Sequence, residues 1–176
     1  MRQRLGIAQA IAGNPRLIIV DEPTAGLDPE ERQRFYHLLA ELAQDRIVVL
    51  STHIVEDVGV LCPRFAVIRQ GKLVASSRPS EALELVAGKI FEGRVDGGEV
   101  EELKRRRHVT QSILVEGRHR VRIFEPSGQA PVGFEPAIPS LEDAYFVLMR
   151  REPAAAADAA DEPATELAEA AAGGEA

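Results

Sequence analysis

The first 77 residues alternate between short apolar runs and a stretch in which apolar residues recur every three or four positions. Leu17 to Val20 is an unbroken apolar run after Asn14 and Pro15, which predicts a parallel strand buried on both faces. The sequence IVVLS predicts a second buried strand. Between them, PEERQRFYHLLAELAQD places apolar residues at helical spacing, namely Phe35, Leu38, Leu39, Leu42 and Ala43. This alternation predicts an α/β unit.

A different pattern follows from residue 89 to residue 151. KIFEGRVD predicts a strand and EVEELKRRR a helix, whereas VTQSILVE and HRVRIFEP, on either side of Gly117, predict a hairpin. The basic run Lys104 to Arg107 can be the cationic end of a helix starting near Gly98 or a phosphate-binding patch. The helix dipole favours the first interpretation. These elements predict a small α+β accessory domain.

The end of the chain combines one more helix with a low-complexity tail. A segment rich in Pro and Gly, 126–139, leads to SLEDAYFVLMRR, in which Ser140 caps a helix and Asp143 stands three residues on. Residues 152–176 are acidic and Ala-rich with almost nothing to bury, which predicts disorder. We therefore divide the chain into 1–77, a connecting helix at 78–88, the accessory domain at 89–151, and the tail.

Composition and charge exclude several classes of protein. The formal net charge of −7 equals the seven acids from Glu152 onward, where no base occurs, so the body of the chain is neutral. A neutral body argues against nucleic acid as a partner. The sequence contains neither an apolar run of eighteen residues nor a signal peptide, which predicts a cytoplasmic location. The single cysteine, Cys62, excludes an intrachain disulfide, and we expect it to be a small buried residue.

Two acids and a histidine are predicted to meet at one edge of the sheet. Asp21 and Glu22 come directly after the first strand, and His53 follows the second. Because the two strands are expected to run parallel, their carboxyl ends lie at the same edge, where open α/β sheets bind ligands. A carboxylate there can hold Mg²⁺, a second can orient an attacking water, and an imidazole can contact phosphate. The combination predicts nucleotide hydrolysis.

These residues also lie within motifs of a known family. LIIVDEP is similar to the Walker B motif of ABC transporter ATPase subunits, TAGLDP resembles their D-loop, and LSTH resembles their H-loop. Upstream, MRQRLGIAQAIAGNP resembles the helix that immediately follows the LSGGQ signature, and FAVIRQGKLVAS is similar to the strand pair that closes the ATPase domain. The motifs have the family's order and spacing, and the resemblance covers residues 1 to roughly 77.

The resemblance implies a fold and a set of roles. The fold would be a partial P-loop NTPase (ABC ATPase) parallel sheet with helices, followed by the α+β accessory domain. Asp21 would bind Mg²⁺ by way of water, Glu22 would be the general base, and His53 would contact the γ-phosphate of ATP. The D-loop would lie at the interface of an ATPase dimer. Three further residues are implied to contact the nucleotide from the D-loop and the signature region: Asp28, Gln3 and Arg2.

Each matched motif also has a plainer interpretation. Asp28, Pro29 and Glu31 fit the N-cap, N1 and capping-box positions of the following helix. A strand-end Asp-Glu pair is often a solvated turn, and His53 can cap the next helix, IVEDVGVLC. The joint occurrence of the motifs in the family's order favours the functional interpretation.

The sequence departs from the family in one important respect. Nucleotide binding needs a glycine loop, G-x-x-x-x-G-K-[ST], whose amides hold the phosphates, and this sequence has none. The Q-loop, the helical subdomain and the LSGG of the signature are also missing, so Met1 falls inside the signature motif. An internal start codon, a broken gene or a deliberately shortened chain would each give this pattern. We expect the chain alone to lack Mg-ATPase activity.

The departure also affects the sheet. In the family, the strand leading to the phosphate loop lies between the strands that match Ile47 to Ser51 and Phe65 to Ile68. Without it, the neighbouring strands would expose backbone groups and apolar faces unless they close together or another chain fills the gap.

We therefore interpret the sequence as the C-terminal half of the ATPase subunit of an ABC transporter. IPSLEDAYFVLMRRE looks like the tail of subunits in export systems, which favours an exporter. The complete protein would hydrolyse ATP between two subunits at the inner face of the cell membrane and drive a transmembrane permease. One alternative is a soluble ABC ATPase of repair or translation, and a pull-down with a membrane permease or with nucleic acid would distinguish it from a transporter subunit. A second alternative is a non-enzymatic partner- or ligand-binding module. Expressing residues 89–151 alone and testing their folding and ligand binding would address it.

Overall fold

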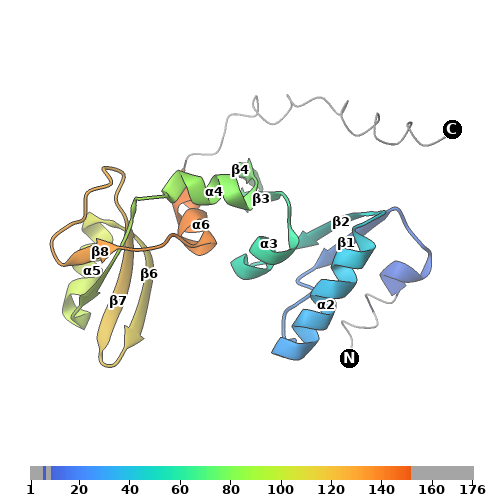
Figure 1. Ribbon diagram of the computed structural model, residues 1–176, viewed down its shortest axis with the longest axis horizontal. Coiled ribbons are helices and arrows are strands. Elements are labelled where there is room, and N and C mark those ends of the chain that lie inside the picture. Colours follow the sequence, from blue (N-terminus) through green and yellow to red (C-terminus); the bar gives the residue numbers. More distant parts are fainter. Residues whose placement is uncertain (1–5, 7–8, 152–176) are drawn as a thin grey trace.

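The N-terminal part of the chain forms a strand, a helix and a second strand. The computed structural model describes Gly6 and residues 9–151. Strands β1 (Leu17–Asp21) and β2 (Ile47–Ser51) pair in parallel, and α2 (Pro29–Leu42) makes the crossover between them, as Figure 1 shows. The predicted strand, crossover helix and parallel strand are confirmed. The register places Asp21 opposite Ser51, so both strands end at the same edge.

Helix α2 begins at the predicted cap and covers one face of the strand pair. Asp28 is the N-cap residue and accepts a hydrogen bond from the backbone N of Glu31 at 2.8 Å, which satisfies a backbone donor of the first turn. The inward side chains of the helix pack on Ile18 of β1 and on partly buried apolar residues of both strands. The helix contributes Phe35, Leu39 and Leu42 to this core.

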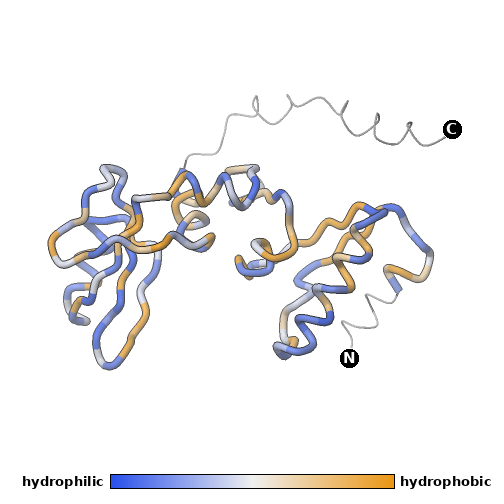
Figure 2. The backbone as a smooth tube through the Cα atoms, in the orientation of Figure 1, coloured by the Kyte–Doolittle hydropathy of each residue, from blue (hydrophilic) through white to orange (hydrophobic). Residues whose placement is uncertain are grey.

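The opposite face of the strand pair is exposed. Its four apolar side chains keep about half or more of their surface accessible: Leu17 50%, Ile19 68%, Ile47 66% and Val49 49%. Figure 2 shows hydrophobic residues along both strands. The prediction that these strands are buried on both faces is wrong for the described chain, because α2 covers one side only. We call these four residues the open face.

The middle of the chain is a helix, a hairpin and a second helix. Helix α3 (Val55–Leu61) leads to the antiparallel strands β3 (Phe65–Arg69) and β4 (Lys72–Ser77), which confirms the predicted strand pair. Helix α4 (Pro79–Val86) lies where a connecting helix was expected. In the described part of the chain β2 and β3 belong to different sheets, so the two strands do not close together.

The third unit is a four-stranded antiparallel sheet, which we call the accessory sheet. Its order is β6-β7-β5-β8, and α5 (Gly97–Arg106) packs against one face, with Lys104, Arg105 and Arg106 in its last turn as the dipole favours. The predicted hairpin at Gly117 is confirmed, whereas β8 falls in the segment expected to be a connection. The strands are β5 (Ile90–Val95), β6 (His108–Val115), β7 (Arg118–Phe124) and β8 (Phe134–Pro136).

The last helix, α6 (Leu141–Met149), returns to the middle of the molecule. Ser140 caps it as predicted, and its side chain accepts a hydrogen bond from the backbone N of Asp143 at 3.2 Å. Figure 1 shows α6 beside α4, between the accessory sheet and α3. Its inward side chains complete a core with the β3–β4 hairpin, α4 and the start of β5, made of Val67, Val74, Ala82, Val86, Ile90, Ala144, Val147 and Leu148. The proposed division at residues 77 and 88 stays a prediction, since this core draws on all three segments.

Two further findings concern expectations from the sequence. Cys62 is only half-buried, and burial, followed by the negative charge of Asp57, raises the pKa of its thiol. Across the described residues we find no helix long and apolar enough to cross a membrane. The tail expected to be disordered, 152–176, lies outside the described residues.

Replacing Gly93 in β5 is expected to destabilise the accessory sheet. A Cβ atom there would lie 2.8 Å from the carbonyl oxygen of Gly133 and 2.8 Å from the ring of Phe134. Gly93→Ala should therefore lower the free energy of unfolding by about 1–3 kcal/mol, measured by urea denaturation. Gly98→Ala in α5 is the matched control, because its Cβ would meet no atom within 4 Å and alanine favours a helix. Equal stability of the two variants would contradict the prediction.

Candidate active site at the ends of the parallel strands

The predicted acids and histidine lie together at the edge where β1 and β2 end. Glu22 follows β1 with a φ of +45°, a left-handed conformation uncommon for a residue with a side chain. Its backbone N donates to the carbonyl oxygen of Ser51 at 2.9 Å, which ties the turn to the end of β2. Because strained backbone is found at functional sites when the surroundings hold it, this turn is a second indication of function beside the motif.

Glu22 and His53 are directly paired. The backbone N of His53 donates to Oε1 of Glu22 at 3.1 Å, and its ring atom Nδ1 lies 2.7 Å from Oε2. Because an ionised carboxylate only accepts hydrogen bonds, Nδ1 carries the proton in this pair. The imidazole is three-quarters exposed, and Nε2 is the ring atom left to meet a ligand. The predicted proximity of the two residues is confirmed, and their roles stay predictions.

Asp21 occupies the last position of β1 and is exposed to solvent. One oxygen of its carboxylate accepts a hydrogen bond from the hydroxyl of Ser51, the residue opposite it on β2. Among the described residues no three His, Cys, Asp or Glu side chains cluster as a metal site. Mg²⁺ commonly takes one or two carboxylates and fills its other positions with water and phosphate, so a single exposed Asp fits this ion.

Of the other predicted contacts, only Asp28 lies among the described residues. Asp28 follows a turn at Gly26, which has a φ of +75°, and acts as the N-cap of α2. The alternative that His53 caps the next helix is wrong, because Ile54 is the N-cap of α3 and makes no side-chain cap. Arg2 and Gln3 lie outside the described residues.

A buried polar cluster beneath the site was not predicted from the sequence. Asp57 of α3 is fully buried and accepts hydrogen bonds from the hydroxyls of Thr24, Tyr36 and Thr52. We call these four residues the Asp57 cluster. One signal in the sequence was available, since Asp57 stands four residues before Leu61 and therefore shares the core-facing side of the helix.

The N-terminus of α6 lies next to His53. An open hollow of about 460 Å³ is lined by His53, Val55 and Glu56 on one side and by Ser140, Leu141 and Glu142 on the other. A Cβ added to Gly59 of α3 would lie 3.5 Å from a methyl group of Leu141, so the two helices are in close contact. Helix α6 therefore borders the candidate site.

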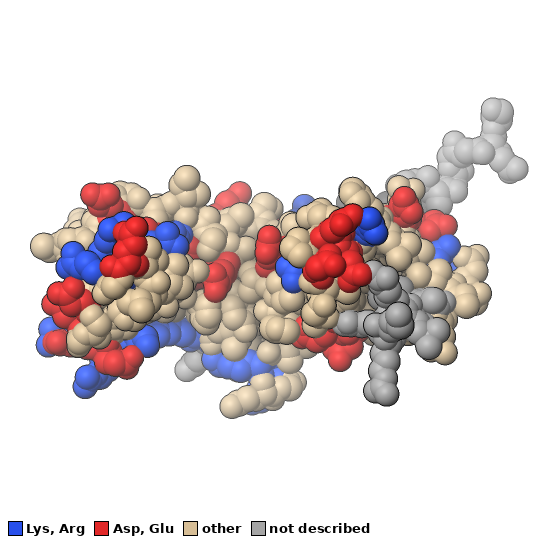
Figure 3. All heavy atoms as spheres, turned by 90° about the horizontal axis from the view of Figure 1, so that it is seen from below, with Lys and Arg blue, Asp and Glu red and all other residues tan. Residues whose placement is uncertain are grey.

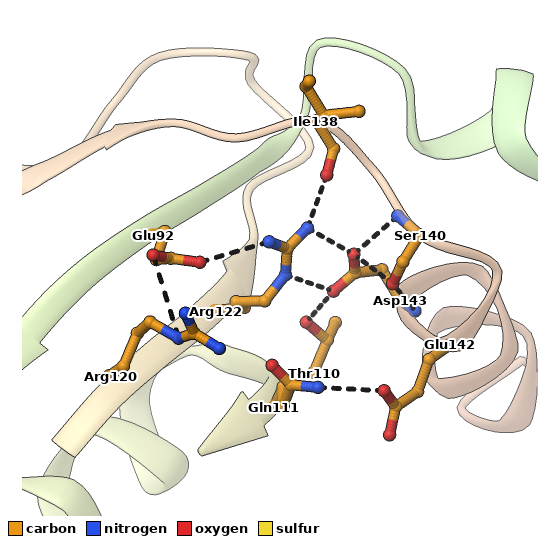
Figure 4. Close-up of polar contacts among 9 residues, drawn as sticks. All are labelled: Glu92, Thr110, Gln111, Arg120, Arg122, Ile138, Ser140, Glu142 and Asp143. Carbon is orange, nitrogen blue, oxygen red and sulfur yellow. Dashed lines mark hydrogen bonds and ion pairs between the residues drawn. The ribbon is translucent and has the colours of Figure 1, made fainter. Parts of the chain in front are cut away.

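A second buried cluster holds the start of α6 on the accessory sheet (Figure 4). Asp143 is 1% exposed and receives hydrogen bonds from Arg122 at 2.7 and 3.2 Å, from Thr110 at 2.5 Å and from Ser140. Burial alone would raise the pKa of Asp143, but the hydrogen bonds from Arg122, Thr110 and Ser140 outweigh it and lower this pKa. Glu92 also pairs with Arg122, at 3.2 Å. We call this group the Arg122–Asp143 clamp.

Comparison with known proteins finds that the chain is similar to export ATP-binding proteins. No family model matches the chain. The Nod factor export ATP-binding protein I of Rhizobium meliloti is 34% identical over 164 residues, which cover 86% of this chain and 48% of that protein. The protein of the same name from Rhizobium johnstonii is 35% identical, covering 77% of this chain and 40% of its own length. The one from Bradyrhizobium diazoefficiens is 29% identical, covering 86% and 53%.

The chain spans about half the length of the curated relatives it matches. The relatives carry ATP-binding and export in their names, which agrees with the Walker B, D-loop and H-loop resemblances. These similarities confirm that the chain is related to the ATP-binding subunits of ABC transporters.

Proposed function

We propose that this chain is the part of an ABC-type ATPase that carries the hydrolytic residues, and that the complete protein binds and hydrolyses ATP to drive export. The observation that carries the proposal is the Glu22–His53 pair, held at 2.7 Å where two parallel strands end. The export names of the relatives support the direction of transport.

The geometry supports a separate role for each residue. Glu22, held by two contacts from His53, would accept a proton from the attacking water and orient it. His53 would donate from Nε2 to the γ-phosphate, where charge changes during the transfer. Asp21 would hold Mg²⁺ through water, with Ser51 fixing its carboxylate. When bound, this ion neutralises charge on the phosphate oxygens.

The open face supports the finer assignment of the fold. Four neighbouring apolar side chains on two strands are about half-exposed or more, and such a patch marks a surface that another part of a protein covers. A central strand and helices of a P-loop NTPase sheet would cover it. In this proposal, residues 1–77 are the C-terminal half of the ATPase domain, 78–88 connect it, and 89–151 form the accessory domain.

The proposal includes partners and a location. ATP hydrolysis would drive a transmembrane permease. A second ATPase subunit would contact this one at the D-loop, near Asp28. Arg2 and Gln3 of the signature region would contact ATP. The assembly would lie in the cytoplasm, at the inner face of the membrane. Acidic and basic side chains are interspersed over the face shown in Figure 3, which gives no support to a repair or translation ATPase that binds nucleic acid.

The test is to supply the missing half. The N-terminal part of the Rhizobium meliloti relative, ending where its similarity to this chain begins, is fused ahead of residue 1. We expect this fusion to hydrolyse Mg-ATP in a phosphate-release assay and the 176-residue chain to show only background. Phosphoryl transfer depends chiefly on holding the phosphate in position, which a chain without the glycine loop cannot do.

Three outcomes would decide the matter. Turnover by the fusion that disappears on chelation of Mg²⁺ supports the proposal. Turnover by the 176-residue chain itself would contradict the expected division of labour. A folded fusion that binds ATP and never hydrolyses it would contradict the assignment of the hydrolytic residues to this chain.

A further inference from the structure

The Asp57 cluster connects three separate segments beneath the candidate site. Asp57 belongs to α3, Tyr36 to α2, and Thr24 and Thr52 to the two turns that follow β1 and β2. Oδ1 of Asp57 accepts from the hydroxyl of Tyr36 at 2.5 Å, and Oδ2 accepts from the hydroxyls of Thr24 and Thr52, the latter at 3.5 Å. One carboxylate therefore holds both turns and the helix between them.

Each turn carries a residue of the candidate site. Thr24 lies two residues after Glu22, at the start of the D-loop resemblance, and is fully buried. Thr52 directly precedes His53, and its hydroxyl also accepts from the backbone N of Ile54 at 3.0 Å. A shift of Asp57 would be transmitted to both members of the Glu22–His53 pair.

A carboxylate in this position needs an explanation beyond packing. Asp57 has no exposed surface, and no basic side chain pairs with it among the described residues. A buried charge without a cation is unfavourable unless several donors surround it. Burial, together with the hydrogen bond to Asp57 and its negative charge, raises the pKa of Tyr36 to about 12, so the phenol remains a donor throughout the neutral range.

We propose that Asp57 is a positioning residue of the ATPase, which holds the turns bearing Glu22 and His53 at a fixed separation through the hydroxyls of Thr24 and Thr52. The inference rests on the proposed function for its catalytic consequence, and its geometric part stands on the chain alone. Asp57 touches neither Glu22 nor a phosphate site, so it acts through the threonines.

The geometric part is tested on the 176-residue chain by nuclear magnetic resonance of isotope-labelled histidine. The chain has four histidines, and two of them, His108 and His119, lie in the accessory sheet and serve as internal references. Asp57→Asn should shift the ring signal of His53 and leave the signals of His108 and His119 in place. Thr24→Val should do the same, because it removes the hydroxyl and keeps the shape of the side chain.

Two control variants separate positioning from a general loss of stability. Thr24→Ser retains the hydroxyl and should leave the His53 signal unchanged, although it creates a small cavity. Glu41→Gln removes a charge from the exposed end of α2 and should also leave it unchanged. If Asp57→Asn fails to fold, the His53 signals of Thr24→Val and Thr24→Ser are compared instead, and this comparison tests the positioning role. An unmoved His53 signal in folded Thr24→Val would overturn the proposal.

The catalytic part is tested in the fusion with the relative's N-terminal half. Asp57→Asn and Thr24→Val should lower kcat by about a hundredfold, as a misplaced catalytic group does, with KM for ATP roughly unchanged. Thr24→Ser should retain kcat. If the unmutated fusion lacks turnover, the proposed function is wrong. The nuclear magnetic resonance experiment on the 176-residue chain still tests the positioning role in that case. A displaced His53 signal with unchanged kcat in the active fusion would overturn the catalytic role of Asp57.

Discussion

Glu22→Gln is expected to lower the turnover of the fused ATPase by about a hundred- to ten-thousandfold, the range that a positioned general base contributes. The amide has the shape of the carboxylate and its single oxygen can still accept the hydrogen bond from the backbone N of His53, so the turn should keep its structure. It cannot take a proton from water. ATP binding should therefore persist while hydrolysis stops, which is measured by comparing nucleotide affinity with phosphate release.

Two comparison variants make this result specific. His53→Ala should cost about 2.7–4 kcal/mol of transition-state stabilisation, as loss of one charge-stabilising donor does. Asp21→Asn should have a defect that lessens as Mg²⁺ is raised, because it weakens metal binding and leaves the proton acceptor intact. The Glu22→Gln defect should not respond to Mg²⁺. Retention of most turnover by Glu22→Gln would show that this residue is not the base.

Asp143→Ala is expected to lower the free energy of unfolding by about 3–5 kcal/mol, the cost of leaving a buried charge without its partner. Arg122 is 14% exposed and would lose a carboxylate that accepts two of its hydrogen bonds, and α6 would lose the half of its capping box that the Asp143 side chain provides. Urea denaturation followed by circular dichroism measures the change. Glu101→Gln removes half of an exposed pair with Lys104 and should leave the free energy of unfolding essentially unchanged. A loss below about 1 kcal/mol in Asp143→Ala would contradict the clamp.

The same residue gives the expected pH dependence. The pKa of Asp143 is lowered in the folded chain, so its contribution to stability is fully present above its value in the unfolded chain, about 3.9. The contribution is lost as the pH falls through the lower, folded value. Acidification should therefore destabilise the unmutated chain more than Asp143→Asn. Parallel acid profiles for the two chains would argue against a charged Asp143 in the folded state.

Local pattern was enough to predict the elements that position the candidate site. The apolar run before Asp21 predicts β1, the cap at Asp28 predicts α2, and the parallel crossover predicts the meeting of Glu22 and His53. Each depends on residues close in sequence or on a general rule of chain direction. The family motifs added the roles, which spacing alone does not provide.

The features that were not predicted all depend on tertiary contacts with residues distant in the sequence. The open face was expected to be buried because an apolar run does not tell how many layers cover it. The Asp57 cluster joins residues up to 33 positions apart, and an acid in a short amphipathic helix usually faces water. Strand β8 is three residues long, and its pairing with β5 follows from the sheet rather than from its own sequence.

The return of α6 has a consequence for biosynthesis. Three of the eight buried residues of the central core belong to this helix, and the others have been made dozens of residues earlier. While the ribosome is still translating the accessory sheet, Val67, Val74 and Val86 have emerged without their final cover. The apolar side chains of the hairpin and α4 therefore stay exposed in the nascent chain until residue 148 has been synthesised. During that interval they can aggregate or bind chaperones. The middle of this molecule can therefore complete its core only after residue 148 has left the ribosome, whereas α2 and its two strands can pack as soon as residue 51 has done so.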